Sequence, residues 1–564
     1  MKVLRFNSAR LAARTLDVLS LACAAIWIAG GVPWKGKILL SHGADPRRAA
    51  ILIMLLAMAF QSCRRESWVA RGAHEAWHQL QRPRVRLWAL AGVTAWACLE
   101  GVLQALALSY PLYDVGIFHQ ILWSLGHGFG FWSSISGAGN FLYDHFSPAL
   151  ALLVPFSLAS GSSPLFLPVL HPVLVFGGVA AWVRLAERFP GASADLRGRL
   201  AAATLVFGIS LDSLWGNLRW GFHENAIAFC ATSWMLCFLF TARGSAVSRW
   251  IRILALLMVS AFSKEILLVN AAFMLVSLIF MTKGLNPFRS RRSELSEVGA
   301  PSALALGIGA ALFIAGFIYF QKLPHPENKN YFLRYYSYLG VGLGGFVETL
   351  IGSPGKVIDA IGWSEIFRYL RVLFLPFLGI PLFFRSGRVS WLLLGILPSF
   401  ASALLSTYSP LRGSGFHYVL EIWPALVAVT LFFLARHPQW IATWAIVGLL
   451  LMAQDPWGQV RNYQDRASVQ SEARRAISEK IPEGAAVVAD ELAGTWVASR
   501  RFVMRWPELK LLPAECPDYA FLRLDEIENE PGSPWRNLLL KCSVGWPSQT
   551  IWSGQGWVIE KLIH

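Results

Sequence analysis

Long apolar runs limit the fold of this chain more than any other feature. A helix needs about 20 apolar residues to cross the hydrocarbon core of a bilayer, and runs of this kind recur from the N-terminus to about residue 454. Of the 564 residues, 55% are hydrophobic and 15% are charged, which excludes a single water-soluble globule because such a protein needs a larger charged surface. We therefore expect an all-α polytopic membrane protein with about 13 transmembrane helices. The expected spans are approximately 16–34, 49–63, 87–109, 164–183, 200–216, 224–242, 249–263, 266–282, 302–321, 366–385, 389–406, 417–435 and 438–454.

Basic residues form short clusters between these runs, and they predict the orientation of the chain. The clusters lie at 2–14, 64–86, 184–199, 243–252 and 283–292, and no Lys or Arg occurs between Arg86 and Arg184. Cytoplasmic loops of membrane proteins are enriched in Lys and Arg. We therefore expect a cytoplasmic N-terminus, an odd number of spans and an extracytoplasmic C-terminus. The net charge of +16 is explained by this orientation, so membrane lipid and not nucleic acid is the expected partner.

Two connectors are expected to form outward loops, at 110–163 and 322–365. The apolar segment 146–160 within the first loop is short and is interrupted by Pro148 and Pro155. If it crossed the membrane, every later basic cluster would move to the outer side. We therefore interpret it as a re-entrant or interfacial helix.

The composition changes at about residue 455 to that of a water-soluble domain. The pattern predicts an amphipathic helix at 466–480 and short strands at 485–490, 501–506 and 519–525. Strands that alternate with short helices indicate a small extracytoplasmic α/β domain over 455–564. Cys516 and Cys542 lie in this domain. In an oxidising compartment they could form a disulfide, and the alternative is two free thiols.

The unusual polar residues of the membrane part fall mostly on the predicted outer face. They come from separate connectors and comprise Asp114, Gln120, Asp144, His145, His223, Glu224, Lys264, Glu265, Arg334, His417 and Tyr418. Each has a simpler explanation, such as a helix cap for Asp114 and Asp144, or a local i,i+4 pair for His417 and Glu421. Ionisable groups gathered at one membrane face from distant segments nevertheless indicate a single cavity.

Several of these residues lie in motifs that resemble a known family. The segments Tyr113-Asp114-Val-Gly-Ile-Phe…Gln120 and Asp144-His145-Phe-Ser-Pro148 are similar to the Tyr-Asp-Leu-Gly-x-Phe-Asp-Gln and Asp-His-Phe-Ser-Pro motifs of a bacterial family of predicted membrane proteins, domain of unknown function 2079. The resemblance covers about 87–564, which makes 1–86 an extra N-terminal two-helix portion and 87–454 the polytopic membrane domain. His119 stands where the family usually has a second acidic residue, so a mechanism with two carboxylates in this motif is not expected.

The family in turn resembles, more distantly, the C-type integral-membrane glycosyltransferases. This resemblance implies a multi-pass enzyme of the bacterial inner membrane with a soluble outward C-terminal domain. It also implies a sugar donor carried on a polyprenyl phosphate, and a catalytic aspartate in the first large outward loop, where Asp114 lies.

A chemical hypothesis follows for each candidate residue. Asp114 is the expected base for the acceptor hydroxyl, since a semi-enclosed carboxylate can have its pKa raised toward neutral pH. Cationic Lys264, Arg334 and His417 are the groups expected to hold the departing phosphate. Asp144 and His145 are candidate ligands, with His223, for a divalent cation such as Mg²⁺ or Mn²⁺. The remaining residues expected to contact substrate are Gln120, His223, Glu224, Glu265 and Tyr418.

Two other functions compete with glycosyl transfer. A transporter or flippase of a lipid-linked or small polar substrate predicts charges at span centres and inverted repeats, whereas the sequence has few charges at span centres and no repeat. A noncatalytic component of envelope assembly would use the outward domain to bind a partner. The clustering of polar groups on one face favours the enzyme.

Overall fold

The computed structural model describes most of the chain after residue 67, with several gaps. The described residues are 32–34, 37–39, 68–136, 139–241, 245–283, 302–322, 333–340, 342–383, 387–413, 417–450, 456–506, 517–524 and 548–562. The predicted span 49–63, Cys516 and Cys542 therefore lie outside the described residues. Of the predicted span 16–34, only Val32–Trp34 is described; it forms the short strand β1, which pairs with β2 (Lys37–Leu39).

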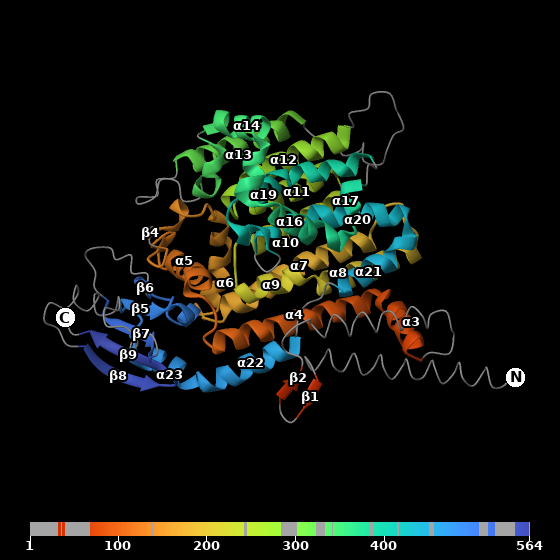
Figure 1. Cartoon of the computed structure of the whole chain (residues 1–564). Helices are drawn as coiled ribbons and strands as arrows, with labels where there is room; N and C mark the ends of the chain where they lie inside the picture. The colour runs from red at the N-terminus through yellow and green to blue at the C-terminus, as the bar shows by residue number, and fades with distance from the viewer. Residues whose placement is uncertain are drawn as a thin grey trace, which may run out of the picture.

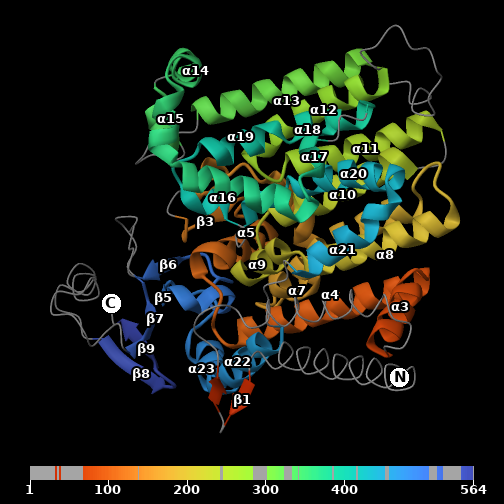
Figure 2. The same ribbon diagram turned by 45° about the vertical axis from the view of Figure 1, so that its right-hand side comes forward.

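The described part up to residue 450 is a layered assembly of helices (Figure 1). Its longer helices are α3 (Trp68–Leu80), α4 (Pro83–Leu106), α5 (Ile117–Gly126), α7 (Phe166–Glu187), α8 (Ala194–Ser210), α9 (Asp212–Trp220), α10 (Asn225–Thr241), α11 (Ala246–Ala261), α12 (Glu265–Lys283), α13 (Ser302–Lys322), α14 (Gly342–Gly352), α15 (Pro354–Ile361), α16 (Trp363–Phe374), α19 (Leu397–Leu405), α20 (Trp423–Arg436) and α21 (Ile441–Leu450). Short turns of helix join them: η1 (Leu112–Gly116), η2 (Phe141–Tyr143), η3 (Pro148–Leu153), α6 (Val154–Ala159), η5 (Leu333–Leu339), η6 (Leu375–Phe377), α17 (Ile380–Phe383), η7 (Gly387–Trp391), α18 (Leu392–Gly395), η8 (Ser409–Arg412), η9 (His417–Val419) and η10 (Pro438–Trp440). In Figure 2, α14 and α15 stand at one edge of this assembly, next to α13 and α16.

Two helices in the described residues, α4 and α7, are long and apolar enough to cross a membrane. They coincide closely with the predicted spans 87–109 and 164–183. A third span arises if α20 and Pro438–Leu449 count as one broken crossing, because these two helices meet at a bend of 118°. Other apolar helices are shorter, including Asn225–Thr241 and Glu265–Met281. The mostly helical fold is thus confirmed, whereas only part of the expected number of spans appears as long apolar helices.

Proline and glycine explain why several apolar runs do not form one long helix. The run predicted as span 366–385 contains Pro376, and the chain divides there into α16, η6 and α17, with Leu378 in the left-handed region at φ 55°. The run 389–406 divides into η7, α18 and α19, and α19 starts with a proline in its first turn. Proline lacks a backbone donor and sterically opposes the preceding turn, so it ends helices that the hydropathy pattern alone would continue.

The interior of the helical part is filled by large aromatic side chains. Trp182 of α7 meets Phe229 of α10 edge to face at 5.2 Å between ring centroids, and Phe207 of α8 stacks on Trp444 of α21 at 4.4 Å. All four rings are at most 2% exposed. These contacts pack α7 against α10 and α8 against α21.

The segment 146–160 forms only two short helices, η3 and α6. Both begin at or near a proline, and together they form an apolar stretch, Pro148–Ala159, that is shorter than a span. The segment is too short to cross a bilayer as a single helix, and its re-entrant or interfacial placement stays a prediction.

The C-terminal part contains helices and one mixed sheet. α22 (Pro456–Val469) and α23 (Ser471–Lys480) precede β5 (Val487–Asp490), η11 (Glu491–Trp496), β6 (Val503–Trp506), β7 (Tyr519–Arg523), β8 (Ser548–Gly554) and β9 (Trp557–Leu562). The strand order is β6-β5-β7-β9-β8, in which β5 pairs in parallel with β6 and β7, and β9 pairs antiparallel with β7 and β8. The expected α/β character of this part is therefore present.

The sheet is packed against the segment that follows α4 and shares a hydrophobic core with it (Figure 1). Buried residues of that segment, such as Leu112 and Ile121, pack in one cluster with Val487 and Phe521 of the sheet. Gly494 of η11 has a positive φ of 52°, and a Cβ atom there would lie 2.7 Å from the carbonyl oxygen of Tyr110. Only glycine allows the two backbones to approach this closely. The C-terminal part is therefore joined tightly to the loop that carries Asp114.

Candidate functional site

A cavity of about 520 Å³ lies where the predicted outward connectors and the C-terminal part meet. Several candidates from the sequence line it together, although they come from different connectors. The lining residues are Pro111, Tyr113, Asp114, Ile117, Phe118, Phe141, Asp144, His145, Trp220, His223, Glu224, Lys264, Tyr335, Tyr336, Tyr408, Leu411, Tyr418, Glu491, Leu492 and Arg505. The structure thus brings Asp114 and Lys264 into one pocket.

Asp114 lies in η1, a single π-helical turn between Pro111 and α5. Such turns are rare and occur often at functional sites. The side chain of Asp114 is 28% exposed, and its Oδ1 lies 4.0 Å from Nε2 of His223. Burial raises the pKa of Asp114 to about 6, although the nearby Arg505 opposes this shift. Asp114 is therefore a carboxylate at neutral pH that can accept a proton readily.

His223 is the neutral neighbour of Asp114. Burial lowers the pKa of His223 to about 3, against the opposing effect of Glu224, so the imidazole is uncharged at neutral pH. The preceding turn contains Gly221 at φ 94°, where a Cβ atom would overlap the side chain of Val115 in η1. Glycine at 221 therefore lets the chain before His223 approach the turn that carries Asp114.

Lys264 is buried and has several partners. Its Nζ lies 2.9 Å from Oε1 of Glu224, donates to Oδ1 of Asn225 at 3.2 Å, and stands 5.2 Å from the ring centroid of Tyr418. Burial lowers the pKa of Lys264, but the carboxylate of Glu224 outweighs this effect and holds the pKa above its ordinary value. The ammonium group is therefore a permanent positive charge in the cavity wall.

Polar contacts continue from this pair into the helical interior. Asn225 donates to Oε2 of Glu421 at 2.9 Å, and Ser399 donates to the other oxygen of the same carboxylate. Asn270 in turn donates to Oγ of Ser399 at 2.6 Å. Glu421 thus links α10 and α19, and through Ser399 also α12, while its expected i,i+4 pairing with His417 stays a prediction because the His417 side chain lies outside the described residues.

His145 and Glu265 form a second pair beside the cavity. Nδ1 of His145 lies 3.3 Å from Oε1 of Glu265, whose other oxygen accepts from the backbone N–H of Phe146 at 3.2 Å. Burial lowers the pKa of His145, but the carboxylate of Glu265 outweighs it and raises the pKa to about 9. Glu265 does not line the cavity. It orients His145.

The predicted metal ligands Asp144, His145 and His223 do not form a three-ligand group in the part of the chain that the structure describes. Nδ1 of His145 is engaged by Glu265, which leaves Nε2 as the ring nitrogen that could bind a metal. Within the described ranges, no three His, Cys, Asp or Glu side chains are placed to hold a metal ion. Asp144 lines the cavity beside His145 without forming such a group. We therefore assign no step to a metal.

One wall of the cavity is built from tyrosines. Tyr335 and Tyr408 lie with ring centroids 4.9 Å apart, and Tyr336 and Tyr418 line the same space. The backbone N–H and hydroxyl of Thr407 both bond to the carbonyl oxygen of Tyr335, which joins the η5 segment to the chain before η8. Such a surface suits a flat, partly apolar ligand that also carries hydroxyl groups.

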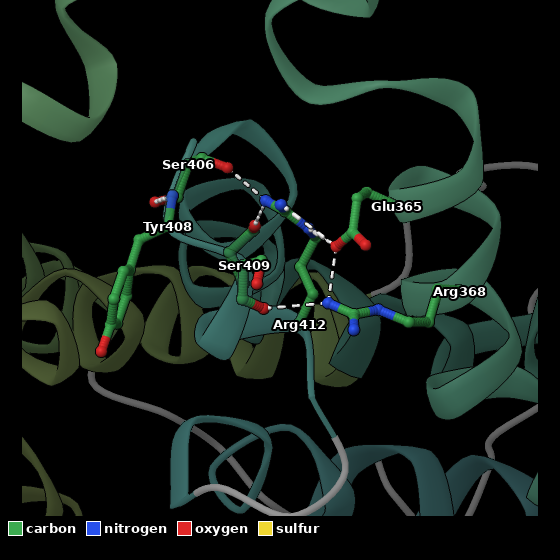
Figure 3. A network of polar contacts seen from close by, with 7 residues as sticks. Glu365, Arg368, Ser406, Tyr408, Ser409 and Arg412 are labelled. Atoms are coloured by element: carbon green, nitrogen blue, oxygen red, sulfur yellow. Dashed lines mark hydrogen bonds and ion pairs between the residues drawn. The ribbon is translucent and has the colours of Figure 1, made fainter.

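A network of polar contacts holds the segment that carries Tyr408 (Figure 3). Arg412 is 1% exposed, and its guanidinium donates to Oε2 of Glu365 at 3.4 Å and to the carbonyl oxygen of Ser406. Arg368 donates to the same Oε2 and to the carbonyl oxygen of Ser409 at 3.2 Å. The network fixes the loop 406–412, and with it Tyr408 and Leu411, against α16.

Arg334 and His417 lie in short helices whose next residues line the cavity. Their side chains lie outside the described residues, while the backbone of each belongs to a short helix, η5 and η9. The following residues in these helices, Tyr335 and Tyr418, line the cavity. The roles expected for Arg334 and His417 remain predictions.

Gln120 lies apart from the cavity lining, although it belongs to the motif that contains Asp114. It is 0% exposed. Its Nε2 donates to Oγ of Ser134 at 2.9 Å and to the carbonyl oxygens of Arg500 and Arg501 at 2.9 and 3.2 Å. Its Oε1 accepts from Oγ of Ser133 and from the backbone N–H groups of Ser134 and Ile135 at 2.9–3.3 Å. Gln120 joins its loop to the C-terminal part, which is a different role from the predicted contact with substrate.

The C-terminal part contributes lining residues that the sequence did not predict. Glu491 begins η11 directly after β5, and Arg505 lies in β6. Oε2 of Glu491 is 3.3 Å from Nε of Arg505, and its Oε1 accepts from the backbone N–H of Tyr113 at 3.2 Å. A signal for Glu491 did exist, because functional side chains often follow the carboxyl end of a buried parallel strand.

One further ligand pattern lies outside the cavity. Helix α3 contains His74-Glu75-Ala-Trp-His78, the spacing found in many zinc proteases. The imidazoles of His74 and His78 meet at 3.0 Å between Nε2 atoms on an exposed face. The structure, within the residues it describes, supplies no third His, Cys, Asp or Glu ligand there. This motif therefore does not form a zinc-protease site in the described part of the chain.

Comparisons with known proteins place the chain in a family. No curated protein matches it. Two crystal structures of ArnT from Cupriavidus metallidurans, one bound to undecaprenyl phosphate and one in the apo state, are similar to this chain with TM-scores of 0.47 and 0.42 and sequence identities of 11% and 10%. Each alignment covers 84% of this chain and 98% of the ArnT chain. Residues 105–515 match the family model described as predicted membrane protein, DUF2079. Since this match spans more than half of the 564 residues and includes both predicted motifs, the chain belongs to the DUF2079 family of predicted membrane proteins.

Proposed function

We propose that this protein is a membrane glycosyltransferase that moves a sugar from a polyprenyl-phosphate carrier to an acceptor in the bacterial envelope. The observation that carries the proposal is Asp114, a carboxylate whose pKa is raised to about 6, in one cavity with the fixed cation Lys264 and a wall of tyrosines. The polyprenyl-phosphate donor is the one implied by the family resemblance in the sequence.

The cavity supplies groups suited to each part of the reaction. Asp114 takes the proton from an acceptor hydroxyl as its oxygen bonds to the anomeric carbon of the sugar. The bond between that carbon and the phosphate oxygen breaks, and the electron pair stays on the departing polyprenyl phosphate. This phosphate gains one negative charge, which Lys264 stabilises because its ammonium group is already positive and fixed in place.

Neighbouring groups prepare Asp114 for this role. His223 is uncharged and 4.0 Å from the carboxylate, so it leaves Asp114 able to accept a proton and does not form a strong ion pair with it. The rings of Tyr335 and Tyr408 offer a stacking surface for the sugar, with hydroxyl groups at its edge.

The test is turnover of polyprenyl-phosphate sugars by the purified full-length protein. A positioned base contributes about 10²–10⁴-fold to rate, so Asp114→Asn is expected to lower kcat by that factor. Asp195→Asn is the matched control, because Asp195 is 73% exposed on α8 and does not line the cavity. Equal turnover in wild type and Asp114→Asn would remove Asp114 from the mechanism. Substrate flux in vesicles without any turnover would favour a transporter.

A further inference from the structure

The C-terminal part places an ion pair in the cavity beside the proposed base. The guanidinium of Arg505 lies 4.5 Å from the ring centroid of Tyr113, the residue next to Asp114. Nε of Arg505 is also 3.3 Å from Oε2 of Glu491. Stacking on an aromatic ring orients the plane of a guanidinium and leaves its edge for oxygen ligands.

Lys264 and Arg505, two of the cationic residues that line the cavity, differ in how firmly their counter-charges are held. Lys264 and Glu224 are 7% and 1% exposed, so parting them would leave a buried charge without a partner. Arg505 and Glu491 are 18% and 36% exposed at a longer separation, which makes their pair easier to open. Burial raises the pKa of Glu491 to about 7 even though Arg505 opposes the shift, so near neutral pH this carboxylate takes up a proton at little cost.

We propose that Arg505 binds the phosphate of the lipid-linked donor, and that this phosphate takes the place of Glu491 at the guanidinium. The identity of the donor rests on the function proposed above, whereas the anion site itself rests on Arg505, Glu491 and Tyr113. A guanidinium matches a phosphate with two parallel hydrogen bonds, which a lysine cannot form. The contact strengthens as the sugar leaves, because the phosphate then gains a negative charge.

Arg505 comes from the C-terminal part of the chain, whereas the proposed base Asp114 comes from the first predicted outward loop. Arg505 belongs to β6, an edge strand of the C-terminal sheet, yet it faces the turn that carries the proposed base. The C-terminal part therefore supplies substrate-binding chemistry in addition to covering the cavity.

The experiment measures equilibrium binding of a polyprenyl phosphate, and of the polyprenol of the same length, to the purified full-length protein at pH 8. Losing a charged, bidentate contact is expected to weaken phosphate binding about 10–100-fold in Arg505→Gln and to leave polyprenol binding unchanged. Arg505→Lys should lie between the two. Glu491→Gln should tighten phosphate binding, since it removes the competing carboxylate. A merely structural role for the pair would not give changes of opposite sign.

Arg501→Gln is the matched control. Arg501 lies in the same segment, and its guanidinium stands 5.0 and 5.1 Å from the rings of Phe129 and Phe502, outside the cavity lining. Equal phosphate affinity in Arg505→Gln and Arg501→Gln, or weaker binding in Glu491→Gln, would overturn the proposal. If Arg505→Gln fails to fold, Arg505→Lys and Glu491→Gln decide it. Phosphate binding that depends on Arg505, in a protein that shows no turnover, would support the anion site and reject the glycosyltransferase function. Turnover in a protein whose phosphate binding does not depend on Arg505 would support the glycosyltransferase function and reject the anion site.

Discussion

Replacing Gln120 by Met should loosen the C-terminal part without altering any group in the cavity lining. The methionine side chain has nearly the same shape but cannot donate to the carbonyl oxygens of Arg500 and Arg501, nor accept from the N–H groups of Ser134 and Ile135. A buried polar group left without a partner costs about 1–3 kcal/mol. Several such groups are affected, and partial rearrangement relieves some of them. We therefore expect the free energy of unfolding to fall by about 3–5 kcal/mol.

Hydrogen exchange of the backbone amides of β5 and β6 is the direct assay. These strands should exchange faster in Gln120→Met, because two of the lost contacts reach the carbonyl oxygens of Arg500 and Arg501 just before β6. Amides in α7 and α8 should keep their protection, because the side chain of Gln120 makes no hydrogen bond to either helix. Gln555→Met is the control. Gln555 is exposed and bonds only to exposed Glu472 at 3.2 Å, so its replacement should change stability by less than about 0.5 kcal/mol. Unchanged exchange in Gln120→Met would refute the assignment of Gln120 as a link between the two parts.

Three other predictions follow from the cavity. Turnover should fall as the pH drops through about 6, because the pKa of Asp114 is raised to about 6 and only its ionised form accepts a proton; a flat pH–rate profile between 5 and 8 would contradict this. Lys264→Met should destabilise the protein by about 3–5 kcal/mol by leaving Glu224 buried without its cation, and adding Glu224→Gln should restore part of this in denaturant unfolding. Equal stability of the single and double variants would argue against the pair. Arg412→Gln should raise the KM for the donor about tenfold, a change of about 1.4 kcal/mol, because it releases the loop 406–412, which carries Tyr408, from α16. An unchanged KM would mean that other contacts hold this loop.

The sequence predicted the positions of helices better than their continuity. The apolar runs at 87–109 and 164–183 correspond to α4 and α7, and α7 stays one helix although Pro172 lies inside it. Hydropathy averages over windows and does not register a single Pro376, which divides the run 366–385. Strands β5, β6 and β7 lie within their predicted segments, whereas β8 and β9 were not predicted. Their signal was the Gln555-Gly556 turn, in which both residues have positive φ, between two strand-like runs.

The site was predictable where chemistry follows from local pattern. Asp114, His223 and Lys264 were selected because ionisable residues next to apolar runs are unusual, and all three line one cavity. Gln120 belonged to the same motif but points away from the lining, because motif membership does not distinguish a side chain that binds substrate from one that supports the fold. Arg505 was missed for a different reason. Its partner Tyr113 is distant in sequence, and only the packing of the C-terminal sheet against η1 brings the two together.

The shared core between the C-terminal sheet and the segment after α4 has a consequence for biosynthesis. A ribosome completes α4 and η1 long before it reaches β5 and β6, and contacts over such separations form late. A nascent chain can therefore insert its helices in the bilayer while the pocket still lacks one side. A product of premature termination would contain the helices but lack the part of the cavity lining that Glu491, Leu492 and Arg505 supply, so the cavity is complete only after the last segment has been translated and has docked.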